Sequence, residues 1–135
     1  FQHLMYENED MTPAERNETW LKLEKKYRPW IDFEDLPFYS RGAGWQRQLH
    51  IYLYPLYYID YCMAQTVAFQ FWLRMLSDPT AAWRDYLTFV DLAGTRTFEE
   101  LVHNAGLETP YTPGEMGRIA EKIGLWLEQN EKKQI

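Results

Sequence analysis

The sequence has little sulfur, glycine or proline. A single cysteine, Cys62, excludes a disulfide scaffold and a zinc site built from cysteines, and it is compatible with a reducing compartment. The 7 glycines and 7 prolines among 135 residues, with a hydrophobic fraction of 46%, exclude a disordered or collagen-like chain. The length suits one domain with enough apolar side chain for a folded core.

Positive charge is also scarce, because 14 basic side chains are outnumbered by 20 acidic ones and the formal net charge is -6. With a pI near 5.0 and no basic run, the chain is not expected to bind nucleic acid or an anionic membrane surface. The longest uncharged apolar stretch, residues 61–73, is shorter than the roughly 20 residues that a membrane span needs. The sequence starts at Phe1 with neither a charged leader nor an apolar signal stretch, so we expect no signal peptide and a cytoplasmic location.

Helix signals are frequent, whereas strand signals are poor. Thr-x-x-Glu capping boxes at Thr12, Thr97 and Thr112, and an Asp-Pro pair at Asp78, each mark the start of a helix. The predicted helices cover residues 13–28, 79–92, 98–104 and 116–131.

The middle of the chain is less regular. Residues 56–76 are apolar on nearly every face, which predicts a helix that is buried all round. Residues 30–44 predict an extended loop, and residues 45–54 fit either a short helix or an irregular buried segment. We therefore predict an all-α fold, an irregular multi-helix bundle in which residues 1–135 form one unit.

Aromatic side chains are unusually abundant, with 6 Trp, 10 Tyr and 7 Phe, and five tyrosines fall within residues 52–61, directly after His50. A buried phenol without a partner costs about 1–3 kcal/mol, so a core built for stability would use phenylalanine. Tyrosine hydroxyls and an imidazole are neutral hydrogen-bond donors, and one well-placed donor stabilises an oxyanion by roughly 3–4 kcal/mol in a water-poor site. The alternative is a tyrosine-rich core whose hydroxyls are satisfied by Asp60, Gln65 and backbone carbonyls. If residues 57–65 are helical, the tyrosines at 57 and 61 share a face.

The chain by itself predicts no metal centre. Its three histidines, His3, His50 and His103, are far apart, and there is no His-Glu-x-x-His sequence. A nucleophile elbow, a phosphate-binding loop and a dinucleotide fingerprint are missing as well.

The run His50-Ile-Tyr-Leu-Tyr-Pro-Leu-Tyr-Tyr-Ile-Asp-Tyr61, followed by Ala64-Gln65 and Ala68-x-Gln-Phe-Trp72, resembles the C-terminal part of oligoendopeptidase F. That family belongs to the thimet-oligopeptidase-like zinc metallopeptidases. The resemblance extends over essentially the whole chain. It departs from the family at Leu56, where the family usually has phenylalanine.

The resemblance implies a mostly α-helical peptidase whose zinc is held by two histidines of His-Glu-x-x-His and a later glutamate, with the glutamate of the motif as general base. These residues are not in this sequence, so the resemblance places them N-terminal to Phe1 and makes zinc a cofactor of the full-length enzyme only. It implies that a histidine and tyrosines of this stretch bind the substrate carbonyl and its oxyanion. The implied catalytic residues are His50, Tyr58 and Tyr61.

Further residues are implied to bind substrate. Tyr57 and Tyr54 are implied as weaker candidates of the same stretch. Gly42 and Gly44 resemble a mobile substrate-contacting loop, with Arg47 as a peptide-binding side chain. The alternative for the two glycines is a tight turn before a helix.

The sequence thus predicts the C-terminal part of a zinc-dependent oligoendopeptidase that hydrolyses short peptides and is inactive on its own. The expected partners are short peptides and the missing N-terminal part of the enzyme. Self-association through an exposed apolar surface at residues 56–72 is also expected of such a fragment. The alternative function is a stand-alone helical module that binds a peptide or protein without catalysis.

Overall fold

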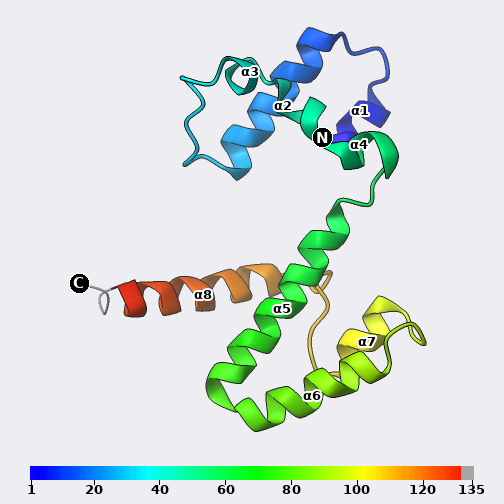
Figure 1. Cartoon of the computed structure of the whole chain (residues 1–135), viewed down its shortest axis with the longest axis vertical. Coiled ribbons are helices and arrows are strands. Elements are labelled where there is room, and N and C mark those ends of the chain that lie inside the picture. Colours follow the sequence, from blue (N-terminus) through cyan, green and yellow to red (C-terminus); the bar gives the residue numbers. More distant parts are fainter. Residues whose placement is uncertain (132–135) are drawn as a thin grey trace. The chain divides into compact units, whose positions relative to one another are not determined.

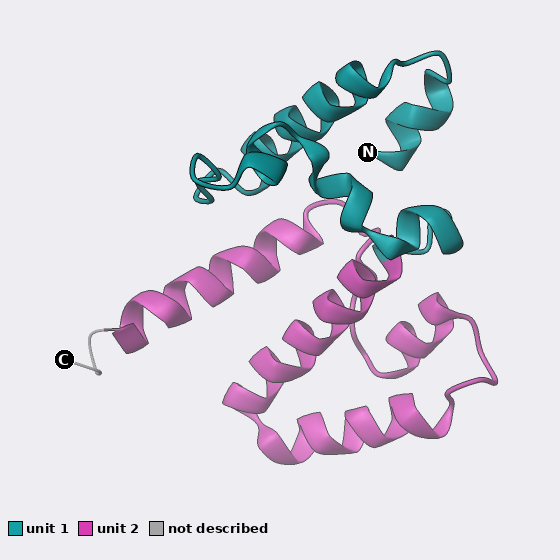
Figure 2. Ribbon diagram, turned by 45° about the horizontal axis from the view of Figure 1, so that its top comes forward, with its two compact units in different colours: residues 1–59 teal, residues 60–135 magenta. Residues whose placement is uncertain are grey.

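The computed structural model describes residues 1–131. The described residues form helices and turns without a strand, which confirms the predicted all-α class (Figure 1). The chain divides into two compact units, Phe1–Ile59 and Asp60–Ile135, which are coloured separately in Figure 2.

The first unit is built on a single long helix with shorter helices around it. Its elements are α1 (Gln2–Glu7), α2 (Pro13–Tyr27), α3 (Pro37–Ser40), the 3-10 helix η1 (Ala43–Arg47) and α4 (Leu49–Leu53). The predicted loop at 30–44 is therefore wrong in part, because α3 and the start of η1 lie within it. The ambiguous segment 45–54 is helical in two short pieces.

Helix α2 begins where the capping box predicts. The Thr12 hydroxyl accepts from the Glu15 backbone N–H at 3.3 Å, and the Glu15 carboxylate accepts from the Thr12 backbone N–H at 2.7 Å. These bonds satisfy two N–H groups that the first helical turn leaves unpaired. The side-chain and backbone hydrogen bonds from Thr12 lower the pKa of Glu15.

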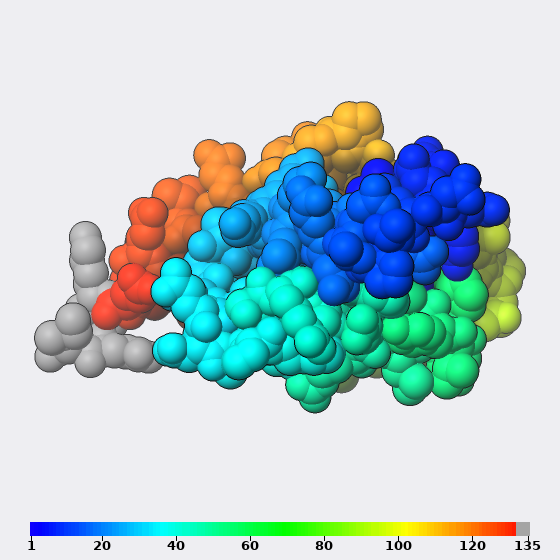
Figure 3. Space-filling view, turned by 90° about the horizontal axis from the view of Figure 1, so that it is seen from above, coloured from blue at the N-terminus to red at the C-terminus, as the bar shows by residue number. Residues whose placement is uncertain are grey.

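The 3-10 helix η1 packs directly against α2. In the space-filling view the segment that follows α2 in the sequence lies alongside α2 (Figure 3). Trp45 Nε1 donates to Asn17 Oδ1 at 2.8 Å. The Phe1 ring lies 5.2 Å from the Trp20 ring and 5.4 Å from the Trp45 ring. These contacts fix the start of α1 against both elements.

Up to residue 131 the second unit contains four helices: α5 (Ile59–Ser77, whose first residue ends the first unit), α6 (Pro79–Asp91), α7 (Phe98–Asn104) and α8 (Glu115–Glu131). Its core consists of Val67, Phe71, Val102, Ala105 and Leu107, with Phe89 and Phe98 packed against them. Helices α6 and α7 begin directly after their N-caps Asp78 and Thr97, as predicted, and each cap residue accepts a backbone N–H through its side chain. Only part of α5 is buried, so the helix predicted to be buried all round is wrong in this respect.

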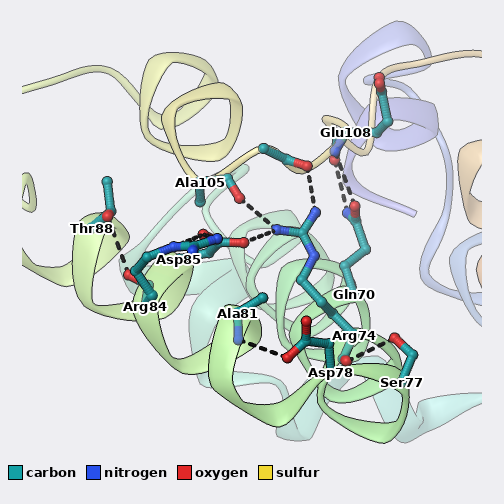
Figure 4. A network of polar contacts seen from close by, with 11 residues as sticks. Gln70, Arg74, Ser77, Asp78, Ala81, Arg84, Asp85, Thr88, Ala105 and Glu108 are labelled. Atoms are coloured by element: carbon teal, nitrogen blue, oxygen red, sulfur yellow. Dashed lines mark hydrogen bonds and ion pairs between the residues drawn. The ribbon is translucent and has the colours of Figure 1, made fainter.

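Two side chains of α5 fasten the loop between α7 and α8 to the rest of the second unit (Figure 4). Arg74 donates to Asp85 Oδ2 at 2.6 Å and to the backbone carbonyls of Ala105 and Gly106 at 2.8 and 2.5 Å. The Gln70 amide donates to the Glu108 carbonyl at 2.8 Å and accepts from its N–H at 3.0 Å. These bonds hold loop carbonyls that no helix satisfies.

The third predicted capping box does not form. Helix α8 begins at Glu115, not Met116, and the buried Glu115 carboxylate accepts from Arg118 Nε at 2.9 Å. The Glu115 N–H donates to the Thr112 backbone carbonyl at 3.0 Å, and the Thr112 hydroxyl donates to the Glu108 carboxylate at 3.2 Å. None of the helices within residues 1–131 is long and apolar enough to cross a bilayer.

Candidate functional site

His50 lies on the single-turn helix α4, which the aromatic contacts of the first unit hold in place. The Tyr52 ring of α4 stacks on the Trp45 ring with centroids 6.2 Å apart. Since Trp45 is hydrogen-bonded to α2 through Asn17, this stack connects α4 to the long helix of the unit.

A tight turn follows α4 and reverses the chain. The Tyr57 N–H donates to the Tyr54 carbonyl at 3.2 Å, with Pro55 and Leu56 at the two central positions. Leu56 has φ 62°, and it is the one non-glycine residue among 1–131 with a positive φ. Proline followed by a left-handed residue is the pattern of a type II turn, which normally has glycine at the second position. The left-handed backbone costs a side-chain-bearing residue about 1–2 kcal/mol.

The turn places three tyrosine rings around the imidazole of His50. The ring centroid of His50 lies 4.9 Å from that of Tyr58 and 6.1 Å from those of Tyr57 and Tyr54. The Tyr57 ring is nearly parallel to the imidazole, at an interplanar angle of 19°. We call these four residues the His50 ring cluster.

The His50 ring cluster lies at the surface. Tyr54, Tyr57 and Tyr58 are 55%, 46% and 48% exposed, and His50 is half-buried. The interpretation of these tyrosines as a tyrosine-rich core is therefore wrong. A surface that gathers one imidazole and three phenols carries hydrogen-bonding groups of the kind that recognise a polar ligand.

Tyr61 belongs to the helix that follows the His50 ring cluster in the sequence. It lies in the first turn of α5, in the second unit, and is 52% exposed. Because α5 begins at Ile59, Tyr57 and Tyr58 precede the helix. The condition that residues 57–65 are all helical is therefore not met.

The two candidate glycines are buried against α2. Gly42 has φ 79°, and a Cβ atom there would lie 2.1 Å from the Asn17 carbonyl oxygen. A Cβ atom at Gly44 would lie 2.8 Å from Trp20 Nε1. This packing matches the alternative of a tight turn before a helix, and substrate contact by these glycines stays a prediction.

Arg47 is exposed and lies over an aromatic ring. Its guanidinium is 5.8 Å from the Tyr39 ring centroid and donates to the Tyr39 hydroxyl. The Phe33 ring stacks on the Tyr39 ring, with centroids 5.6 Å apart. Arg47 is thus a positioned surface cation, and its role in peptide binding stays a prediction.

One residue that contacts the site has no signal in the sequence. Gln2 accepts a hydrogen bond from the Leu56 N–H through Oε1 at 2.8 Å. The two residues are 54 positions apart, and no local pattern links a glutamine in a short helix to a distant turn. Within residues 1–131, no three His, Cys, Asp or Glu side chains converge to hold a metal ion.

Comparison with known proteins gave matches among solved structures. No family model and no curated protein matches the chain. A protein assigned as an oligoendopeptidase F, solved by X-ray crystallography at 3.1 Å, is 47% identical over 99% of this chain, with a TM-score of 0.89. PZ peptidase A with an inhibitor is 44% identical over 95% of it, with a TM-score of 0.87. A protein assigned as an oligoendopeptidase F from Bacillus anthracis strain Ames is 33% identical over 99%, with a TM-score of 0.72.

The helical fold and the three matching structures define the chain as similar to one part of oligoendopeptidase F and PZ peptidase A. It belongs to the oligoendopeptidase F family, as the resemblance of residues 50–72 predicts. The chain spans 24%, 23% and 20% of the length of the three matching structures, which is about a quarter or less.

Proposed function

We propose that this chain is the C-terminal part of a zinc-dependent oligoendopeptidase and supplies the wall that binds the scissile carbonyl of a short peptide. The match to oligoendopeptidase F and PZ peptidase A supports a peptidase. The observation that carries the assignment to this wall is the His50 ring cluster, in which one imidazole and three phenols gather around a strained turn.

In the proposed mechanism His50 and Tyr58 donate hydrogen bonds to the substrate carbonyl oxygen. Both groups donate without carrying charge in their neutral forms, and the bonds strengthen as negative charge develops on that oxygen. Tyr57 and Tyr54, on the two ends of the turn, orient the peptide. For Tyr61 as an oxyanion donor the support is the sequence resemblance.

The residues described here do not form a zinc site, since no ligand set converges within residues 1–131. We therefore assign the metal to the part of the enzyme outside this chain and derive no step through it. For the chain alone we expect neither stoichiometric zinc nor peptide cleavage. Metal analysis and a peptide hydrolysis assay on the purified chain test this, and cleavage that survives repurification would contradict it.

The exposure of the His50 ring cluster supports action within a larger protein. Hydrogen bonds stabilise an oxyanion strongly only where water is excluded, but these tyrosines are about half exposed. Leu53, Leu56 and Ile59 beside them are each more than half exposed. We propose that the remainder of the peptidase covers this surface, and that a second copy of the chain covers it when the remainder is absent.

A chimera tests the proposed function. The chain replaces the matching quarter of the 47% identical oligoendopeptidase F, and hydrolysis of a short peptide is measured. We expect an active chimera in which His50→Phe and Tyr61→Phe each lower kcat by about a hundredfold, the effect of one lost oxyanion donor, while KM changes little. Tyr6→Phe, at an exposed tyrosine of α1, is the matched control.

The alternative function, a stand-alone module that binds a peptide without catalysis, is favoured by the half-exposed aromatic surface. It predicts that the isolated chain is a monomer that binds peptides, and that the chimera is inactive. An inactive chimera would therefore contradict the peptidase proposal.

A further inference from the structure

We propose that Gln2 is a positioning residue for the His50 ring cluster, because its side-chain carbonyl holds the turn that sets Tyr54 and Tyr57 beside the imidazole. This inference rests on the proposed function, since it assigns a role in substrate binding to the geometry of that cluster. Gln2 does not touch the rings in this role and acts through the backbone of Leu56.

Gln2 accepts its hydrogen bond from Leu56, the one residue of the turn with a positive φ. Leu56 is held at φ 62°, where a residue with a side chain is disfavoured, and its N–H donates to Gln2 Oε1 at 2.8 Å. The bond joins two residues that are far apart in sequence. It therefore constrains the turn from outside rather than from its own flanking residues.

The chemistry of the amide fixes its orientation. The Leu56 N–H is a donor, so only the carbonyl oxygen of Gln2 can face it, and the amide nitrogen must point the other way. There the Nε2 atom is buried with no hydrogen-bond partner among the described residues. A side chain that served stability alone would not bury an amide with its donor unsatisfied, so the carbonyl bond to the turn is the contact that the geometry favours.

Gln2 is itself firmly placed. Phe1 packs against Trp20 and Trp45, with ring centroids 5.2 and 5.4 Å away. These contacts anchor the first turn of α1 to α2 and η1. Through Gln2 the turn at Leu56 is thus connected to the long helix of the unit.

The test compares three variants of the chain by NMR. Gln2→Met keeps the length of the side chain and removes the acceptor, whereas Gln2→Glu keeps an acceptor oxygen. Gln129→Met, at an exposed glutamine of α8, is the matched control. The measurements are the exchange rate of the Leu56 N–H and the nuclear Overhauser contact between the rings of His50 and Tyr58. The Trp45 indole N–H signal reports whether the unit stays folded.

We expect Gln2→Met to raise the Leu56 exchange rate about fivefold, the effect of one lost hydrogen bond, and to weaken the ring contact. Gln2→Glu should restore both, and the control should change neither. An unchanged Leu56 rate in Gln2→Met, or no recovery in Gln2→Glu, would overturn the proposal. Loss of the Trp45 signal in Gln2→Met would also overturn it, because Gln2 would then be required for folding of the whole unit.

The outcome is distinct from that of the chimera. If His50→Phe and Tyr61→Phe leave kcat unchanged there, the proposed function fails whatever happens at Leu56. If they lower kcat but Gln2→Met leaves the exchange of Leu56 unchanged, only the positioning role of Gln2 fails.

Discussion

Because the backbone of Leu56 is left-handed, we expect a glycine at this position to give a more stable protein than an alanine, the reverse of the usual order of stability. In Leu56→Ala the Cβ atom keeps the cost of about 1–2 kcal/mol for φ 62°, whereas Leu56→Gly removes it. Glycine loses about 0.5–1 kcal/mol more than alanine through the entropy of the unfolded chain. We therefore expect Leu56→Gly to be more stable than Leu56→Ala by about 0.5–1 kcal/mol.

This comparison removes the leucine side chain in both variants, so the contacts of that half-exposed side chain cancel. The assay is urea unfolding followed through the indole N–H signal of Trp45, which belongs to the same unit. Ala120→Gly, on the exposed face of α8 in the second unit, is the control and is followed through the indole N–H signal of Trp126 in the same helix; it should show the ordinary order, with glycine less stable by about 0.5–1 kcal/mol. If Leu56→Ala is as stable as Leu56→Gly, the turn is not strained and the reasoning about its restraint fails.

Three further predictions concern packing and pH. Arg74→Met should destabilise the second unit by about 2–4 kcal/mol in thermal unfolding, because two backbone carbonyls lose their side-chain donor and Asp85 keeps only the exposed Arg84 as a partner. Arg84→Met, which removes that exposed partner, should cost less than about 1 kcal/mol. Gly42→Ala should prevent folding of the first unit, because its Cβ atom would overlap a backbone oxygen. Gly117→Ala, whose Cβ atom would meet nothing within 4 Å, should stabilise α8 by about 0.5–1 kcal/mol. Circular dichroism measures both effects. The backbone and side-chain hydrogen bonds from Thr97, the cap of α7, lower the pKa of Glu100. The contribution of Glu100 to stability is therefore present above the ordinary pKa of a glutamate and is lost as pH falls through the lowered pKa. Glu100→Gln should flatten the dependence of stability on pH below about pH 5, and an unchanged dependence would contradict this.

Local signals predicted the long helices of this fold well. The starts of α2, α6 and α7 follow from cap residues whose side chains accept backbone N–H groups a few positions away. Such bonds join residues that are close in the sequence, so a pattern of four residues can predict them. The same residue pattern at Thr112 failed because the Glu115 carboxylate accepts from Arg118 and the Glu115 N–H donates to the Thr112 carbonyl, and a pattern of four residues does not contain Arg118.

The composition of the candidate site could be predicted, but its geometry could not. The tyrosines after His50 were evident as donors, yet helical spacing gave the wrong arrangement, since Tyr58 reaches the imidazole through a turn. A left-handed leucine has no sequence signature, because the turn it occupies normally requires glycine. Its restraint by Gln2 is a contact between distant residues, which periodicity cannot show.

The central claim is that the His50 ring cluster binds the oxygen on which charge develops during peptide cleavage. The most direct measurement is kcat of the Tyr58→Phe chimera, which removes one hydroxyl and keeps the ring that contacts His50. The account predicts a fall in kcat of about a hundredfold with KM within about threefold of the unsubstituted chimera. A Tyr58→Phe chimera that cleaves the peptide as fast as its Tyr6→Phe control would contradict it.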